Sequence, residues 1–277
     1  MRWFLRLLTL ALILALGLAG YGYWSATREP VVREARIQVS GWPRGERPLR
    51  LLLMADIHVQ GPDMRPSRLE GIVEQANALA PDVVLIAGDF IGDKPVGTRT
   101  YTADEMAAPL ARLRAPLGLY AVLGNHDHWN DPGAVRAALT RAGIRLLTNE
   151  AVRVGPLALG GLDDDHTSRS DLGRTLVAMQ MARGVPVLLS HSPDPFPALP
   201  DDVPLMLSGH THCGQVRLPG VGALVTFSRH GKRYACGRFD ERGRTLIVSA
   251  GLGTSGVPFR IGAAPDMWLI EVGPKTR

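Results

Sequence analysis

Residues with metal-binding side chains follow five apolar runs of the chain directly. In chain order the runs and their endings read LLLMADIH, VVLIAGD, YAVLGNHD, VLLSH and LMLSGHTH. One such ending needs no special explanation, because Asp, Asn and Gly favour turns. Five endings that hold five of the eight histidines indicate one shared site. The candidate ligands are Asp56, His58, Asp89, Asn125, His191, His210 and His212.

These side chains suit divalent metals. Carboxylate and amide oxygens combined with imidazole nitrogens favour Mn, Fe or Zn, and the motifs themselves place no thiolate in competition. Alternate residues of an extended segment point to the same side, so Asp56 and His58 are expected to bind one metal. His210 and His212 are expected to do the same from another strand end. Asp89 is a carboxylate able to bridge two cations.

The motifs require strands that end at the site. Short apolar runs at 49–55, 83–87, 119–123, 185–189 and 204–207 predict buried strands, and open α/β sheets form sites at the carboxyl ends of strands. Glycine precedes the ligands at 88, 124 and 209, where it permits sharp turns. Further strands are expected at 31–39, 145–147, 157–159, 245–249 and 267–272, and helices at 67–79, 103–113, 132–142 and 171–182. Ser67 and Glu70 fit a capping box that opens the first of these helices.

The order of the motifs resembles that of the calcineurin-like metallophosphoesterases. The matching pieces are D-x-H, G-D, G-N-H-D, a later histidine and G-H-T-H, which together span residues 51–212. The resemblance implies an α/β fold, a two-sheet sandwich flanked by helices, with the site at one sheet edge. The alternation of strands and helices in the first half of the chain agrees with an α/β class.

The resemblance also implies roles for the site residues. A first metal would be bound by Asp56, His58 and His212, and a second by Asn125, His191 and His210, with Asp89 bridging them. His126 would stand beside the phosphate without binding a metal, and Asp127 would orient it. The two cations would share a hydroxide that attacks phosphorus. Manganese is the first expectation for both metals, with iron or zinc as alternatives.

Within the family, the chain is most similar to the bacterial membrane-associated branch. The residues that carry this similarity are GHTHCGQ at 209–215 and SAGLGTSGVPFR at 249–260. Members of related branches cleave phospholipid head groups or the pyrophosphate of UDP-diacylglucosamine. The implied activity is therefore that of a phosphodiesterase or pyrophosphatase on a phosphorylated, lipid-linked substrate. Cys213 stands where that branch often has glycine.

Two other functions remain open. One is a tethered phosphodiesterase for soluble nucleotides. The other is a non-catalytic scaffold of the same fold, whose signature would be the loss of ligands, although every ligand position is filled here. Arg260 and His128 are the candidate substrate-binding residues, with structural roles as the alternative for both. The acidic loop at 163–166 is interpreted as a solvated loop.

The N-terminal segment is apolar from residue 7 to residue 24, after Arg2 and Arg6. At ~1.5 Å per residue, a helix of this length is roughly 27 Å long and just spans a bilayer. Tyr23 and Trp24 stand where an aromatic belt belongs. A cleaved signal peptide and a buried helix are the alternatives. The leading arginines predict a single-pass anchor with the catalytic domain on the non-cytoplasmic side.

Composition limits the remaining possibilities. Of the 277 residues, 45% are hydrophobic and 21% charged, which predicts a globular chain and excludes disorder. The net charge is +5 without a dense run of Lys and Arg, so no nucleic acid is expected as a partner. Cys213 and Cys236 either pair in an oxidising compartment or stay unlinked.

The expected segments are an anchor at 1–24, a linker and first strand at 25–48, and one phosphoesterase domain at 49–277. Oligomeric state is left open.

Overall fold

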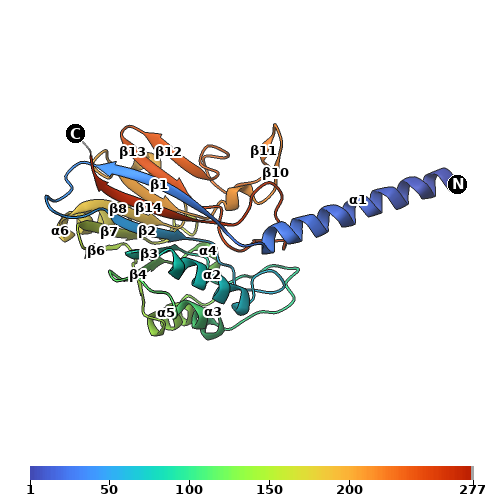
Figure 1. The fold of residues 1–277 in the computed structure, drawn as a ribbon, viewed down its shortest axis with the longest axis horizontal. Helices are drawn as coiled ribbons and strands as arrows, with labels where there is room; N and C mark the ends of the chain where they lie inside the picture. Colours follow the sequence, from blue (N-terminus) through green and yellow to red (C-terminus); the bar gives the residue numbers. More distant parts are fainter. Residues whose placement is uncertain (276–277) are drawn as a thin grey trace.

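Two six-stranded sheets form the centre of the computed structural model, which describes residues 1–275 (Figure 1). The strands of the first sheet are β1 (Val31–Val39), β2 (Leu49–Met54), β3 (Val83–Ala87), β4 (Leu119–Val122), β5 (Ile144–Leu146) and β14 (Asp266–Pro274). Those of the second sheet are β6 (Glu150–Val154), β7 (Leu157–Leu162), β8 (Val185–Ser190), β9 (Leu205–Ser208), β12 (Gly237–Glu241) and β13 (Arg244–Val248). The predicted mixed α/β sandwich flanked by helices is confirmed.

The parallel direction of neighbouring strands places the segments that follow them at one edge of each sheet. The order of the first sheet is β1-β14-β2-β3-β4-β5, and β2 to β5 are parallel. The order of the second sheet is β12-β13-β9-β8-β7-β6, and β13, β9, β8 and β7 are parallel. Because parallel strands end at the same edge of their sheet, the segments that follow β2, β3 and β4 lie close together, as do those that follow β8 and β9.

The alternation of side chains along each strand builds the core. In β2, Leu51 and Leu53 belong to the cluster between the two sheets, whereas Leu52 and Met54 pack against helices on the outer face. All four are fully buried, and each such side chain contributes about 1.5–3 kcal/mol relative to an exposed one. The apolar runs of the sequence are therefore strands buried on both faces.

Helices cover the outer face of each sheet. The first sheet is covered by α2 (Pro66–Ala78), α3 (Ala103–Leu110) and α5 (Pro132–Arg141), and the second by α6 (Leu172–Ala182). The predicted capping box at Ser67 and Glu70 is wrong, because Pro66 takes the first helical position and the N-cap is Arg65. A capping box instead opens α3, which ends at Leu110, three residues before the predicted end.

Two kinds of strand were not predicted. The edge strands β6 and β12 are half-exposed and therefore lack a continuous apolar run. A two-stranded hairpin, β10 (Arg217–Leu218) and β11 (Gly222–Ala223), stands apart from both sheets. These elements depend on pairing with distant segments or on a turn, and neither leaves a periodic pattern in the sequence.

The N-terminal helix α1 (Arg2–Thr27) leaves the domain as a long isolated rod (Figure 1). It is long and apolar enough to cross a membrane, with a mean hydropathy of 2.0 over its most apolar window. The helix continues to Thr27 and buries Ser25 and Ala26, so the segment predicted as linker and first strand at 25–48 begins inside α1. Strand β1 pairs along its whole length with β14 and is therefore part of the first sheet.

Candidate metal centre

The seven predicted ligands gather where strands of both sheets end. Asp56 and His58 follow β2, Asp89 follows β3, and Asn125 opens the short helix α4 (Asn125–Trp129) after β4. His191 follows β8, and the remaining pair follows β9. None of the seven side chains belongs to a residue more than 5% exposed. Buried polar groups of this number require partners, so their arrangement decides the chemistry.

The backbone turns sharply at five of these residues. Their φ angles are positive, at values between 48° and 69°, a region that residues other than glycine seldom adopt. They are Asp56, His58, Asp89, His210 and His212. The prediction that the D-x-H and H-x-H segments are extended is therefore wrong. Asp56 and His58 still reach one cluster, as predicted, whereas His210 and His212 reach different ones. Turns after the strands direct them, and backbone conformations of this kind concentrate at functional sites.

One cluster contains Asp56, His58 and His212. Nε2 of His58 lies 3.0 Å from Nε2 of His212, which in turn lies 3.7 Å from Oδ1 of Asp56. Each residue offers a ligand atom, and the atoms lie within 4.8 Å of one another. The cluster joins the end of β2 to the turn after β9, so it connects the two sheets.

A second cluster contains Asp89, Asn125, His191 and His210. Nε2 of His191 lies 3.0 Å from Oδ1 of Asn125 and 3.1 Å from Nδ1 of His210. His210 and His212 thus point into different clusters, although one residue separates them. This is the division of the ligands that the family resemblance implies.

Asp89 lies between the two clusters. Its Oδ2 is 3.4 Å from Nε2 of His58 and 3.3 Å from Nε2 of His191. Its other oxygen accepts a hydrogen bond of 2.9 Å from the backbone N–H of His126. One carboxylate oxygen therefore faces ligand atoms of both clusters.

The donor set fits divalent cations. Nδ1 of His191 contacts the carbonyl oxygen of Ala87 at 2.7 Å and must donate to it, which leaves the Nε2 lone pair facing the cluster. Nε2 of His210 lies 3.4 Å from the carbonyl of Phe227, so Nδ1 faces inward. Lone pairs of imidazole, amide and carboxylate that converge at about 3 Å need a positive charge among them. The residue types suit Mn, Fe or Zn.

Electrostatics in the site favour the neutral, metal-binding form of His58, His210 and His212. Burial holds the pKa of His58 and of His212 well below the ordinary value, so both are neutral, as metal ligands must be. Burial also lowers the pKa of His191, but the attraction of Asp89 outweighs burial and raises that pKa well above its ordinary value. Burial raises the pKa of Asp56 to about 7. Burial also opposes the ionised Asp89, but the attraction of His191 holds the pKa of Asp89 well below its usual range. A cation would stabilise both carboxylates in their ionised form.

Two glycines allow the ligands to approach the backbone. A Cβ at Gly124 would overlap Oδ1 of Asp89, and a Cβ at Gly209 would overlap Oδ2 of Asp56. The glycine that precedes a ligand in these motifs therefore makes space for a carboxylate that comes from another strand.

His126 lies beside the ligands with Asp93 as its partner. Its Nδ1 is 2.6 Å from Oδ1 of Asp93, and its Nε2 is 3.4 Å from the hydroxyl oxygen of Ser255. Burial lowers the pKa of His126, but the contact with Asp93 outweighs burial and raises that pKa above its ordinary value.

The prediction that Asp127 orients His126 is corrected by these contacts. The Asp127 carboxylate is fully buried and accepts hydrogen bonds from backbone N–H groups. The donors are Asp89, Phe90, Ile91 and Gly124. Asp127 therefore shapes the turn that carries Asp89. Asp93 was missed because it lies in an irregular loop with no motif around it.

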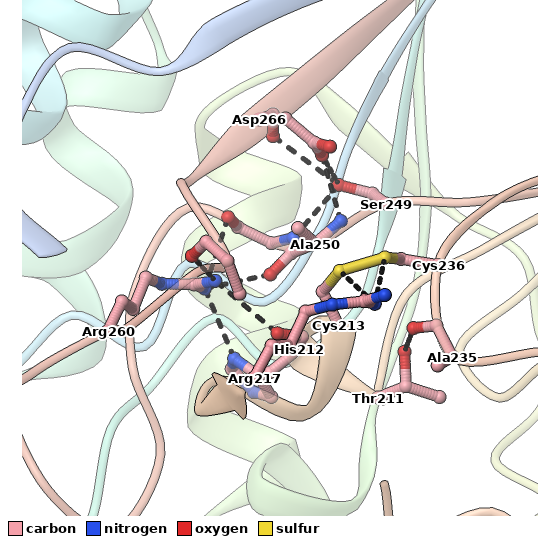
Figure 2. The surroundings of a disulfide bond; sticks show 12 residues. Thr211, His212, Cys213, Arg217, Ala235, Cys236, Ser249, Ala250, Arg260 and Asp266 are labelled. Atoms are coloured by element: carbon pink, nitrogen blue, oxygen red, sulfur yellow. Dashed lines mark hydrogen bonds between the residues drawn. A yellow bond between two sulfur atoms is a disulfide. The ribbon is translucent and has the colours of Figure 1, made fainter. Parts of the chain in front are cut away.

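Arg260 is fully buried and does not face the cavity at the site, contrary to its predicted substrate contact. Its guanidinium donates to the carbonyls of Ala250 and Ala263 at 2.8 and 3.2 Å, and lies 3.3 Å from Nδ1 of His212 (Figure 2). His128, the other predicted substrate contact, has its Nε2 2.8 Å from Asp163. Both residues are occupied by structural contacts.

A cavity of about 160 Å³ opens over the ligands. Four of its lining residues were not predicted as site residues: Trp129, His166, Phe227 and Ser255. Trp129 and Phe227 are 56% and 68% exposed. His166 belongs to the loop interpreted as solvated, yet its ring centre lies 4.9 Å from that of His210. Such residues reach the cavity from separate loops, so no sequence spacing marks them.

The two cysteines form a disulfide, which decides between the alternatives left by the sequence (Figure 2). Cys213 directly follows the ligand His212, and Cys236 lies 23 residues later. Beside the disulfide, the Thr211 hydroxyl donates to the carbonyl of Ala235 at 2.5 Å. The disulfide therefore joins a ligand-bearing turn to the segment that follows the hairpin.

Comparisons with known proteins agree with this geometry. The family model described as calcineurin-like phosphoesterase matches residues 49–214. A "Transmembrane protein with metallophosphoesterase domain" from Danio rerio is 32% identical over 95% of this chain, which spans 62% of that relative's length. An "Uncharacterized metallophosphoesterase" from Aquifex aeolicus is 30% identical, with 88% of this chain and 92% of that protein covered.

Alignments with solved structures are partial and have low sequence identity. The NAD nucleotidase of Haemophilus influenzae aligns with a TM-score of 0.49 at 17% identity, over 74% of this chain and 51% of that one. The family model covers more than half of the chain and includes all seven candidate ligands. The chain belongs to the calcineurin-like phosphoesterase family.

Proposed function

We propose that this protein is a two-metal hydrolase of phosphoester or pyrophosphate bonds, held at a membrane by α1 and acting on a lipid-linked substrate. The observation that supports two metals best is the position of Asp89, whose Oδ2 faces a histidine nitrogen of each cluster at 3.4 and 3.3 Å. A single structural metal would need only one closed set of ligands.

The ligands divide into two sets that share Asp89. The first cation would be held by Asp56, His58 and His212, and the second by Asn125, His191 and His210. When bound, such cations supply Lewis-acid activation of water and neutralise charge on the phosphoryl group. Manganese is the first choice for this set of oxygen and nitrogen donors, with iron or zinc as alternatives.

His126 would act on the leaving group. It lines the cavity, and its Nδ1 is held by Asp93, so its Nε2 is fixed beside Ser255. A positioned imidazole can hold a proton at Nε2 for the departing oxygen, a contribution of about 10²- to 10⁴-fold in rate. Asp93 would act through His126 by fixing the ring and its protonation.

The cavity mouth supports a substrate with an apolar part. Trp129 and Phe227 expose large apolar surfaces beside the ligands. A soluble phosphate ester gains little from such walls, whereas the first carbons of a lipid chain would pack on them. The N-terminal helix would keep the domain near this substrate. UDP-diacylglucosamine-type and phospholipid substrates both have this combination of phosphate and acyl chains.

The disulfide supports a location outside the cytoplasm. Disulfides persist in oxidising compartments and are rare where thiols are kept reduced. The basic residues Arg2 and Arg6 precede the apolar stretch of α1, which favours an N-terminus on the cytoplasmic side. Both features favour a single-pass anchor with the catalytic domain on the non-cytoplasmic face.

A metal-reconstitution screen tests this function. The full chain is purified in detergent, stripped with chelator and reloaded separately with Mn, Fe and Zn. Elemental analysis is expected to find two ions per chain. Hydrolysis is then measured on phosphomonoesters, phosphodiesters, nucleotides, pyrophosphates and lipid phosphates, with the lipid-linked compounds expected to turn over fastest. Faster turnover of nucleotides would favour the tethered nucleotide phosphodiesterase, and bound metals without any hydrolysis would favour the scaffold.

A further inference from the structure

The hairpin between the disulfide cysteines exposes a dense group of apolar side chains. We call residues 216–227, which contain β10 and β11, the apolar hairpin. Beyond residue 27, nine large apolar residues of the described chain are exposed, and five of them lie here. They are Leu218, Val221, Leu224, Val225 and Phe227, each between 43% and 68% exposed. Single exposed apolar residues are ordinary, but a contiguous patch indicates an interaction surface.

The apolar hairpin is attached to the part of the domain that holds the base of α1. Arg217 donates its backbone N–H to the carbonyl of Ile261 at 2.8 Å, and the N–H of Ile261 donates to Gln215 at 3.0 Å. The neighbouring residue, Arg260, donates its backbone N–H to the carbonyl of Gly22 in α1 at 2.9 Å. Figure 1 shows the hairpin at the end of the domain from which α1 departs.

No flexible linker separates the apolar part of α1 from the domain. Gly22 lies so close to Phe259 that an added Cβ would be 2.9 Å from it, and the Tyr23 hydroxyl donates to Pro62 at 3.3 Å. Both residues fall within the apolar stretch that ends at Trp24. The interface of a bilayer that holds this stretch would therefore lie at the level of these contacts, where the domain surface begins.

Positively charged residues near the apolar hairpin suit the interface of a bilayer. Residues 214–239 include five Lys or Arg and no Asp or Glu, and three of the five, Arg229, Arg233 and Arg238, form ion pairs with carboxylates outside this range. The ammonium of Lys232 donates to the carbonyl of Val221 at the hairpin turn, 3.0 Å away, and makes no ion pair with a carboxylate among residues 1–275. Apolar side chains beside an unpaired cation are typical of segments that lie in the interface of an anionic bilayer.

We propose that the apolar hairpin inserts into the bilayer interface beside α1 as a second membrane contact. The occupant of this surface is a lipid bilayer that contains anionic lipid, and the inference rests on the proposed anchoring of α1. Phe227, at the end of the hairpin, also lines the cavity over the metal ligands. Insertion would therefore turn the cavity mouth toward the headgroup layer, so that a lipid phosphate could enter without leaving the membrane.

Fluorescent labelling of the full chain tests this contact. Both native cysteines are disulfide-bonded, so Leu224→Cys introduces the single free thiol for a polarity-sensitive dye. The protein is reconstituted in vesicles of phosphatidylcholine and phosphatidylglycerol that carry a nitroxide near the headgroup. We expect quenching of this dye by the lipid nitroxide and protection from aqueous iodide. The matched control is Met181→Cys, which lies 78% exposed on α6, far from α1 (Figure 1), and is expected to respond to iodide alone.

A second substitution tests the apolar character of the surface. Val221→Asp in the Leu224→Cys protein is expected to abolish most of the lipid quenching, whereas Val177→Asp on α6 leaves it unchanged. If the protein floats with vesicles but the dye at 224 responds to iodide alone, like the dye at 181, the hairpin contact is overturned. The anchoring by α1 would be unaffected by this result. Shielding from iodide without lipid quenching would indicate a second copy of the chain as the occupant and also overturn it.

Vesicle flotation and hydrolysis of a soluble ester distinguish a failure of this inference from a failure of the proposed function. Failure of the full chain to float with vesicles would overturn the anchor and the hairpin contact together. Hydrolysis of a soluble ester by the same labelled protein reports on the metal site alone. Lipid quenching at 224 in protein without hydrolysis would support the hairpin contact and count against the catalytic proposal.

Discussion

Asp89 is the residue on which both proposed metal sites depend. We expect Asp89→Ala to lower metal content from two ions per chain toward none and to reduce turnover by more than about 100-fold, since even residues behind direct ligands contribute 10- to 100-fold. Elemental analysis and ester hydrolysis measure the two effects. The control is Asp104→Ala, whose carboxylate is 73% exposed. Normal metal content in Asp89→Ala would exclude a bridging role.

His126 separates chemistry from metal binding at the residue scale. His126→Ala is expected to keep near-normal metal content and to lose about 10²- to 10⁴-fold in kcat, because the contribution arises in the transition state. Asp93→Asn keeps the shape of the partner but weakens the hydrogen bond to Nδ1, so it is expected to lower kcat less, with KM unchanged. Its pH–rate profile should shift, which a purely structural role would not cause. Metal loss in His126→Ala would place this residue among the ligands.

The turns after the strands are the elements that set the geometry of the site. Gly124→Ala is expected to displace Asp89, because the new Cβ would overlap Oδ1 of that carboxylate. We expect a loss of about 1–3 kcal/mol in unfolding free energy from overpacking. Metal affinity should fall as well, which titration with metal would show.

The matched control is Gly71→Ala within α2, where an added Cβ meets no atom within 4 Å. There the same change is expected to stabilise the protein by about 0.4–1 kcal/mol, because it lowers the entropy of the unfolded chain. Equal effects at the two positions would mean that the close approach at Gly124 is unimportant.

The start of β3 carries a pH-sensitive contact between elements. Asp82 accepts hydrogen bonds from the Arg47 guanidinium at 2.9 and 2.6 Å and from the N–H of Arg50 in β2 at 2.8 Å. The bond from Arg47 holds the pKa of Asp82 below its ordinary value of 3.8. A carboxylate with a lowered pKa in the folded state stabilises the fold above its ordinary pKa, and this contribution is lost as pH falls through the lowered value.

Asp82→Asn should therefore reduce the melting temperature at neutral pH, with a difference from wild type that shrinks as the solution is acidified below pH 3.8. Thermal melts across this range measure the difference. The control is Asp202→Asn at an exposed position. A constant difference at all pH values would assign the effect to shape and not to charge.

At the scale of the whole molecule, α1 is joined rigidly to the domain and its apolar part extends beyond it. Removing residues 1–20 keeps Gly22 and its contacts with the 257–261 segment, so we expect a soluble domain with two metals and unchanged turnover of a soluble ester. Turnover of a lipid-linked substrate in vesicles should fall much further, because tethering raises the local concentration at the bilayer.

The measurement for this truncation is the ratio of the two rates in full-length and shortened protein. Removal of residues 1–27 is the comparison, since it also deletes the buried Ser25 and Ala26 and should cost stability. An unchanged ratio after removal of residues 1–20 would favour soluble nucleotides as substrates. In that case α1 would only locate the protein at the membrane.

The sequence by itself determined the strands that end at the site and the metal-binding residues that follow them. Both are local properties: an apolar run of five or six residues is long enough to be a buried strand, and the next polar residue must stand at its end. The order of Asp56, Asp89 and Asn125 along the chain was enough to predict their meeting, because they follow parallel strands that end at one edge of the first sheet. His191 follows β8 of the second sheet, so its place beside them depends on how the two sheets pack.

Only the tertiary structure decided which side chains face one another. His210 and His212 separate into two clusters because positive φ angles turn the backbone between them, and alternation in an extended segment does not describe such turns. Asp93, and not Asp127, contacts the ring of His126, and the guanidinium of Arg260 donates to a backbone carbonyl of its own loop. The joining of the apolar hairpin to the base of α1 depends on contacts across some 200 residues. Non-local contacts of this kind have no period in the sequence, so packing alone determines them.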